Sequence, residues 1–339
     1  MKFVNSITLN TAVYRNKNGL DDTTRLEVVN LANVPWKDNS MASAFINDDG
    51  LTTVSNFNAS VRNMSGTFYN CSSLTTVGTL PTGVQDISQA FYNCSSLISA
   101  PTIPTSVTNM DSSFENCSLL TTISDLDNCS QLTTMKATFQ NCSSLVNAPA
   151  LPSSVTRMNY TFDGCSSLVN APSIPSATTA LENTFKNCSS LVNAPIIHSL
   201  VTSLSNTFNG CSDLVNIPEI STSVTNMSGT FDGCISLSGS IKILSTEITS
   251  ATDCFNNTSA NKDVYIPFTY DNSVPTNTYN TFNAIYSIDP SSRVNGVLLK
   301  DANVDIPFET DYDYIDLGNG NYELTNYKGN ETNITTPNV

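Results

Sequence analysis

The sequence predicts a repeat solenoid, and three observations lead to this fold class. A phenylalanine recurs at intervals of 23, 23, 23, 25, 23, 23, 23, 23 and 24 residues from Phe45 to Phe255. A cysteine stands three residues after the phenylalanine in eight of these ten units. Prolines recur at the tenth and thirteenth places after it. Such a period is typical of a coil in which each unit buries its apolar face only against its neighbours.

The phenylalanines and cysteines are expected to point inward and to form the columns of the core. Leu follows at the sixth place, as in Leu74, and Val at the sixteenth, as in Val84. Evenly spaced cysteines in this apolar frame are expected to be small buried core residues. The structural columns consist of Phe68, Phe91, Phe114, Phe139, Phe162, Phe185, Phe208 and Phe231, and of Cys71, Cys94, Cys117, Cys142, Cys165, Cys188, Cys211 and Cys234.

The prolines exclude a helix through the middle of each unit, although apolar residues three or four apart would otherwise suggest one. Pro101 with Pro104, and Pro172 with Pro175, are examples of the pairs that break it. We therefore expect short extended segments that turn at Pro, Ser, Thr and Asn, with one helical turn around Phe-x-x-Cys. Stacked segments pair about 4.8 Å apart, so ten units predict a rod or shallow arc of roughly 50 Å.

The pattern F-x-x-C-S-S-L-x-x-A-P-x-I-P-x-S-V-T-x-M resembles the BspA-like leucine-rich repeats of bacterial surface proteins, bacteriophage proteins and some large viruses. The resemblance covers residues 35–260. It implies a leucine-rich-repeat-like right-handed coil of about 23-residue units with a parallel β-sheet face. It also implies attachment or ligand binding rather than catalysis. The departures are local: Asp48 replaces the first cysteine, His198 replaces one proline, and the Phe114 unit has two extra residues.

The two ends lack the repeat and predict separate regions. Residues 1–34 are interpreted as an N-terminal cap or attachment segment that covers the first unit, and residues 35–260 as the solenoid. Residues 261–339 predict a small β-rich C-terminal region, with strands at 263–268 and 293–301, a short helix at 279–286, and strands joined by a Gly-Asn turn within 314–327. This region also resembles segments that follow such repeats in phage tail-associated and surface proteins.

Composition excludes several classes of partner. The chain has 14 basic and 29 acidic residues, for a net charge of −15, so we expect no nucleic-acid binding. No apolar run is long enough for a membrane span, so we expect no membrane insertion. Polar residues from Asn5 to Thr11 interrupt the N-terminus, so no signal peptide is recognisable.

The residue types needed for catalysis are scarce. His198 is the single histidine and therefore the single candidate base for a Ser or Cys triad, and its interpretation is an exposed loop residue. The column cysteines lack the clustered pairs of a zinc site. Cys129 and Cys254 lie off the columns and are better candidates than the column cysteines for exposed, modifiable thiols, although the favoured interpretation is that they too are inert. We expect no cofactor, no metal and no enzymatic activity.

The remaining candidate for function is the surface. The place after the phenylalanine varies from Tyr69 to Asp163 and Lys186, which suggests exposure. Four units carry Val-Asn after the column leucine, and an asparagine ladder there would hydrogen-bond sugars or peptides, or alternatively satisfy turn and inter-unit backbone groups. The predicted binding surface consists of Val146, Asn147, Val169, Asn170, Val192, Asn193, Val215 and Asn216.

These observations predict a non-enzymatic recognition protein, a receptor-binding or adhesion module on a phage particle or cell surface. The expected partners are a protein or glycan on a host cell surface, or other virion proteins, and a homo-oligomer is compatible with the repeat. The expected location is the virion, as part of a phage tail or surface, or the extracellular space. The alternative is a structural virion or surface scaffold that binds only its own assembly.

Overall fold

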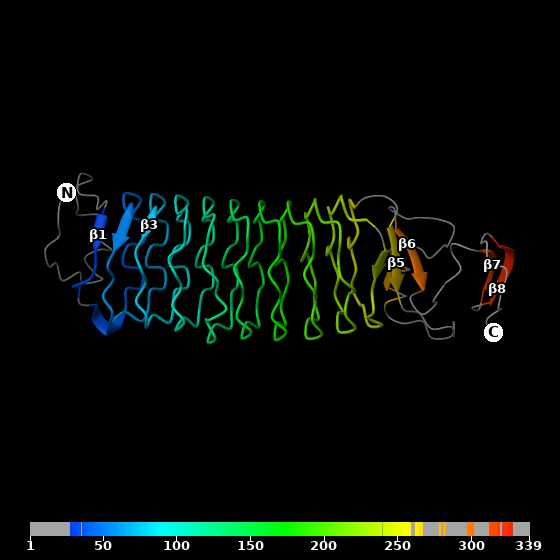
Figure 1. The fold of residues 1–339 in the computed structure, drawn as a ribbon, viewed down its shortest axis with the longest axis horizontal. Coiled ribbons are helices and arrows are strands. Elements are labelled where there is room, and N and C mark those ends of the chain that lie inside the picture. The colour runs from blue at the N-terminus through cyan, green and yellow to red at the C-terminus, as the bar shows by residue number, and fades with distance from the viewer. Residues whose placement is uncertain are drawn as a thin grey trace.

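The computed structural model shows an elongated stack of rungs, each made of one repeat unit (Figure 1). It describes residues 28–34, 36–238, 240–258, 262–266, 278, 281–282, 297–301, 312–318 and 321–327. Two three-stranded parallel sheets, β1-β2-β3 and β4-β5-β6, lie toward the two ends of the stack of rungs. Strands β7 and β8 form an antiparallel pair. The elements are β1 (Val28–Asn30), the 3-10 turn η1 (Lys37–Asn39), β2 (Thr53–Ser55), β3 (Thr76–Val77), β4 (Ser240–Lys242), β5 (Lys262–Ile266), β6 (Val297–Asp301), β7 (Tyr312–Gly318) and β8 (Asn321–Tyr327).

The predicted parallel sheet face is present only as small sheets and isolated parallel bridges, and the prolines supply a reason. Between β3 and β4 the units are joined on this face by isolated parallel bridges. In the first sheet the tenth place after the phenylalanine is not proline, and the Gly78 N–H donates to the Val54 carbonyl at 2.8 Å. A proline at that place has no N–H to donate. Most units between the two sheets carry such a proline: Pro101, Pro149, Pro172, Pro195 and Pro218.

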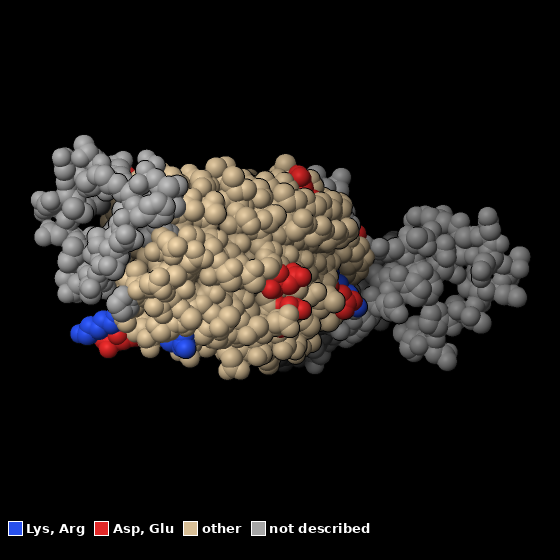
Figure 2. Space-filling view, turned by 60° about the vertical axis from the view of Figure 1, so that its left-hand side comes forward, with Lys and Arg blue, Asp and Glu red and all other residues tan. Residues whose placement is uncertain are grey.

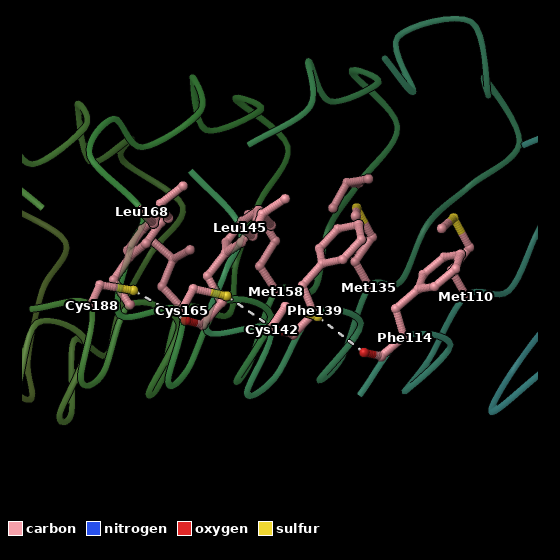
Figure 3. Close-up of a cluster of buried hydrophobic side chains, with 14 of the residues drawn as sticks. Met110, Phe114, Met135, Phe139, Cys142, Leu145, Met158, Cys165, Leu168 and Cys188 are labelled. Carbon is pink, nitrogen blue, oxygen red and sulfur yellow. Dashed lines mark hydrogen bonds between the residues drawn. The ribbon is translucent and has the colours of Figure 1, made fainter. Parts of the chain in front are cut away.

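The phenylalanines form a continuous buried column along the solenoid axis, as predicted. Ring centroids in neighbouring rungs, from Phe45 to Phe255, lie 5.2–5.9 Å apart, and their planes differ by 2–19°. Phe282 adds an eleventh buried ring, at 6.3 Å from Phe255. Figure 3 shows two members of this column packed with the methionines and leucines of the same rungs.

The segment around each phenylalanine is a series of turns rather than the expected helical turn. In the second unit, Gly66 and Asn70 have φ angles of 58° and 60°, and equivalent positive angles recur in the other units. Asn and Gly tolerate this left-handed conformation best, which explains why they alternate at the place two residues after the phenylalanine. The N–H groups of alternate residues then point to the following rung, as from Phe68 to the Ala90 carbonyl at 2.8 Å.

A row of buried hydroxyl groups, which sequence reasoning missed, runs beside the phenylalanines. The Thr67 hydroxyl lies 3.0 Å from the Met41 carbonyl of the preceding rung and 2.6 Å from the Met64 carbonyl of its own. The same pair of contacts recurs up to Thr230. The signal was present, since Thr or Ser directly precedes the phenylalanine in seven units: Thr67, Ser113, Thr138, Thr161, Thr184, Thr207 and Thr230.

At the C-terminal end, pairing and packing continue past residue 260. Strand β5 pairs in parallel with β4, and Val264, Ile266 and Phe282 belong to the same buried core as the repeats. The Thr278 hydroxyl accepts the Ile248 N–H and donates to the Ser245 carbonyl. Strands β5, β6, β7 and β8 overlap the ranges 263–268, 293–301 and 314–327 where strands were expected. The β-rich C-terminal region as a unit and the division into three regions stay predictions. The proposed N-terminal cap lies outside the described residues except for 28–34, where β1 pairs with β2.

Candidate ligand-binding face

The predicted Val-Asn surface lies on the exposed side of the rungs, just after the leucine column. We call its eight residues, Val146, Asn147, Val169, Asn170, Val192, Asn193, Val215 and Asn216, the Val-Asn face. The leucine before each pair, such as Leu145, is buried and anchors the segment in the core. The four asparagines are exposed, Val146 and Val169 are 44% and 37% exposed, and the other two valines are half-buried.

Backbone hydrogen bonds hold the four pairs in one register. Parallel bridges join Asn147 to Asn170, Asn170 to Asn193, and Asn193 to Asn216. The Val169 N–H donates to the Val146 carbonyl at 3.2 Å, and the same bond follows between the next two pairs. Equivalent side chains therefore form two straight rows along the solenoid axis, one of valines and one of asparagines.

The asparagine amides of this face are largely open. Asn216 Nδ2 donates to Asn193 Oδ1 at 3.1 Å, whereas the side chains of Asn147 and Asn170 have no hydrogen-bond partner among the described residues. Among the described residues no backbone group is bonded to these four amides, which favours the binding interpretation over the alternative that they satisfy turn or inter-rung backbone groups.

A second asparagine row, two places after the phenylalanine, behaves differently. There Asn70 Nδ2 donates to Asn47 Oδ1 at 2.8 Å, and Asn93 Nδ2 donates to Asn70 Oδ1 at 3.1 Å. Asn141 Nδ2 likewise donates to Asn116 Oδ1 at 2.8 Å. The rung spacing thus permits neighbouring amides to pair, and Asn147 and Asn170 stay open although their rungs are adjacent.

Charge is absent from the three central rungs on this side. Between residues 137 and 212 the charged residues are Arg157, Asp163, Glu182 and Lys186, and each stands between five places before and one place after a phenylalanine. Residues 141–156, 164–179 and 187–202 contain no charged residue, and these stretches include the Val-Asn face of these rungs together with the turns on both sides of it, which we call its edges. Figure 2 shows how sparse charged side chains are on one face of the described body. Asp213 and Glu219 flank only the last pair.

The variable place after the phenylalanine is not the freely exposed position that was expected. Its residues are half-buried because neighbours in the row contact one another. The rings of Tyr69 and Tyr92 stack with centroids 4.4 Å apart. Asp163 is only 9% exposed, and its carboxylate accepts a hydrogen bond from Gln140 Nε2 at 2.9 Å. Burial raises the pKa of Asp163.

The cysteines are buried, form no disulfides, and in the column donate hydrogen bonds to the neighbouring rung. Each column thiol donates to the phenylalanine carbonyl of the preceding rung, as from Cys142 Sγ to the Phe114 oxygen at 3.1 Å (Figure 3). Burial raises the pKa of Cys117 to about 12. A thiol at neutral pH is therefore an un-ionised hydrogen-bond donor here, and the nucleophilic thiolate is suppressed.

The two off-column cysteines are also buried, so the alternative that they are exposed, modifiable thiols is wrong. Cys254 directly precedes Phe255 and occupies the place of the buried hydroxyl row, with no exposed surface. Cys129 is 2% exposed because it occupies the second proline place of its unit. Burial raises the pKa of both thiols.

The remaining candidates for chemistry do not assemble into a site. His198 is half-buried rather than exposed, and its Nε2 lies 3.0 Å from the Ile174 carbonyl oxygen. The described residues contain no group of three or more His, Cys, Asp or Glu side chains suited to a metal ion. Among them, too, no helix has the length and apolar character to cross a bilayer.

Comparison with known proteins gives a family match and several similar structures. The model of the "BspA type Leucine rich repeat region (6 copies)" matches residues 41–169 and 132–262. No curated protein matches the chain. A leucine rich cell surface protein of Faecalibacterium prausnitzii is 20% identical, with a TM-score of 0.43, over 83% of this chain and 89% of that one.

Two further bacterial structures are similar at comparable identity. The leucine rich repeat protein of T. pallidum is 21% identical, with a TM-score of 0.30, over 63% of this chain and 79% of that one. A leucine-rich repeat protein of Bacteroides ovatus is 20% identical, with a TM-score of 0.28, over 71% of this chain and 87% of that one.

The family match spans residues 41–262 of 339, which is more than half of the chain, and it coincides with the rungs of the solenoid. It supports a non-enzymatic recognition or adhesion role of the kind that these surface repeats serve, and it indicates no enzyme family. The chain belongs to the BspA-type leucine-rich repeat family.

Proposed function

We propose that the protein is a non-enzymatic adhesion or receptor-binding module and that the Val-Asn face is its ligand-binding surface. The observation that carries the proposal is the row of open amides beside a row of partly exposed valines. Each exposed Asn side chain offers a donor and an acceptor, and each Val offers apolar area. Because the backbone of this segment is bonded between rungs, the side chains are held in place before a ligand arrives, which lowers the entropic cost of binding.

The proposed setting is the outside of a cell or a phage particle. The family supports a surface location in general terms, and the phage tail is proposed from the likeness of residues 261–339 to tail-associated segments. Either setting presents many copies of the solenoid side by side. Weak binding at each copy would then be reinforced by multivalency.

The proposal is tested by binding of the fluorescently labelled full chain to a panel of bacterial and animal cells, measured by flow cytometry. The double variant Asn170→Asp and Asn193→Asp introduces two charges on the Val-Asn face with little change in shape. The matched control, Ser153→Asp and Ser176→Asp, adds the same charge at exposed positions on the adjoining edge. We expect the first variant to lose binding and the control to retain it.

Equal binding by both variants would show that the ligand lies elsewhere. The scaffold alternative predicts a different outcome: no cell binding by the native chain, and concentration-dependent self-association in sedimentation velocity. Thermal melts of both variants should match those of the native chain, so a folding defect would be detected separately.

A further inference from the structure

We propose that the ligand of the Val-Asn face is an uncharged, straight polysaccharide strand that lies along the solenoid axis with one sugar unit per rung. The sugars would be joined through equatorial bonds, as in β-1,4-linked hexose chains. This inference rests on the proposed function, because it names the ligand class of the same face.

The first step is charge. The three central rungs carry no charged residue on the Val-Asn face or on the edges beside it, although the chain as a whole has a net charge of −15. An anionic polymer would be repelled by the protein and would find no cation on this face. A cationic partner would find no carboxylate on the three central rungs. Carboxylates stand beside the two ends of the face, where Asp125 Oδ1 accepts the Ala150 N–H at 2.9 Å and where Asp213 and Glu219 flank the last pair. A neutral ligand fits the face best.

The second step is hydrogen bonding. A sugar ring presents hydroxyl groups that both donate and accept, and an amide side chain does the same with its Nδ2 and Oδ1 atoms. Asn147 and Asn170 have no hydrogen-bond partner among the described residues, so a ligand would not have to displace one. The amides that do pair, Asn193 with Asn216, do so at 3.1 Å and keep further donor and acceptor capacity.

The third step is the apolar row. The valines lie next to the asparagines in the chain and form a row of four. Ile98, which is 54% exposed, holds the equivalent place two rungs before Val146, and Thr121 stands between them. The C–H faces of sugar rings are the apolar part of a neutral glycan and would pack on this row. Because Val offers less contact area than an aromatic ring, each rung contributes little, and affinity must accumulate over several rungs.

The fourth step is the repeat distance, which separates a glycan from a peptide. Paired rungs repeat about every 4.8 Å, whereas an extended peptide places side chains on one side only every 6.6–6.8 Å or so. A peptide along the axis would therefore fall out of register after two rungs. A sugar linked equatorially at both ends has a length comparable with one rung, so each rung meets one ring. Because successive rings of such a chain are flipped, identical hydroxyl groups face the solenoid at every second rung, and the amides, which both donate and accept, can bond either orientation. Backbone N–H groups of this face, such as that of Val169, are already bonded between rungs, which also excludes added strand pairing.

The test is isothermal titration calorimetry of the full chain with cellobiose, cellotriose, cellotetraose and cellohexaose. We expect affinity to rise with each sugar up to about four, the number of Val-Asn pairs, and then to level off. Maltohexaose, whose bonds curve the chain, and polygalacturonate, which is anionic, should bind at least tenfold more weakly. Asn147→Ala and Asn170→Ala should each weaken cellohexaose binding about two- to tenfold. The edge variant Ser176→Ala should leave it unchanged.

The outcomes separate this inference from the function on which it rests. If none of the glycans binds but Asn170→Asp with Asn193→Asp abolishes cell binding, the face is a binding surface and the ligand class is wrong. If maltohexaose binds as well as cellohexaose, the proposed register of one sugar per rung is wrong. If cell binding survives the charged face variant, the proposed function itself fails, and glycan binding that is insensitive to Asn147→Ala would overturn the inference independently.

Discussion

Truncation of one ring in the phenylalanine column should destabilise the whole stack, and Phe162→Ala is the sharpest such change. Phe162 has no exposed surface and stacks between Phe139, at 5.6 Å, and Phe185, at 5.7 Å. Removal of a buried Phe side chain costs about 3–5 kcal/mol, from lost burial and from the cavity that remains. The rings on both sides have no room to collapse inward without breaking their own stacking, so we expect the upper half of this range.

The assay is thermal unfolding followed by far-UV circular dichroism and by Tyr fluorescence, because transitions that coincide for both probes indicate two-state unfolding. For a body of this size each kcal/mol shifts Tm by about 2–4 °C, so Phe162→Ala, at about 4–5 kcal/mol, should lower Tm by about 8–20 °C. The control on the same rung is Val169→Ala, which is 37% exposed and should stay within about 0.5 kcal/mol of the native chain. Comparable Tm shifts in the two variants would refute the inward and outward assignments of the rung.

Three further predictions follow from other features of the rungs. Burial raises the pKa of the Cys117 thiol from 9.0 to about 12, so the folded chain keeps this proton at a pH at which the unfolded chain releases it. The contribution of the thiol to stability is therefore complete below about pH 9 and is lost as pH rises from 9 toward 12. Cys117→Ser should make the fall of Tm over this pH range shallower. Asn93→Ala replaces an asparagine, which tolerates the left-handed φ of 56°, by an alanine, which does not, and removes the amide that donates to Asn70; it should cost about 1–2 kcal/mol in urea unfolding, whereas Asn93→Gly should cost less. Deletion of residues 162–184, one unit of 23, should leave a folded, shorter chain in circular dichroism and limited proteolysis, whereas deletion of 11 residues there should unfold it; equal damage from both would mean that the rungs are not modular.

The residues that point into the core could be predicted from the sequence because the same apolar residue type recurs at the same place in most units. The phenylalanine, cysteine and leucine columns are buried as expected, and each was visible as one residue type at one place in the period. Cys254 was misplaced because its unit was one residue longer than its neighbours. Counting backward from Phe255, rather than forward from Phe231, places it in the buried hydroxyl row.

Features that depend on contacts between rungs were harder to predict. A side chain such as Asp163 looks exposed when each unit is considered alone, but a rung on either side covers most of its surface. The Thr67 hydroxyl looks unsuited to a core until the carbonyl of the preceding rung is available to accept from it. The open amides of Asn147 and Asn170 likewise depend on the direction of two neighbouring side chains, which the one-dimensional pattern does not specify.

The two sides of each rung hydrogen-bond in opposite directions, and this bears on how the chain folds as it leaves the ribosome. N–H groups around a phenylalanine, such as that of Phe68, donate forward to the next unit, whereas the Val169 N–H donates back to the previous one. A newly made unit can therefore dock through both sides, because its phenylalanine-side carbonyls accept and its Val-Asn-side N–H groups donate. Its own phenylalanine-side N–H groups and Val-Asn-side carbonyls stay without partners until the next unit is translated. The most recently translated rung of a nascent chain therefore exposes unpaired N–H and carbonyl groups, together with one face of its phenylalanine ring, to which a chaperone or another chain could bind.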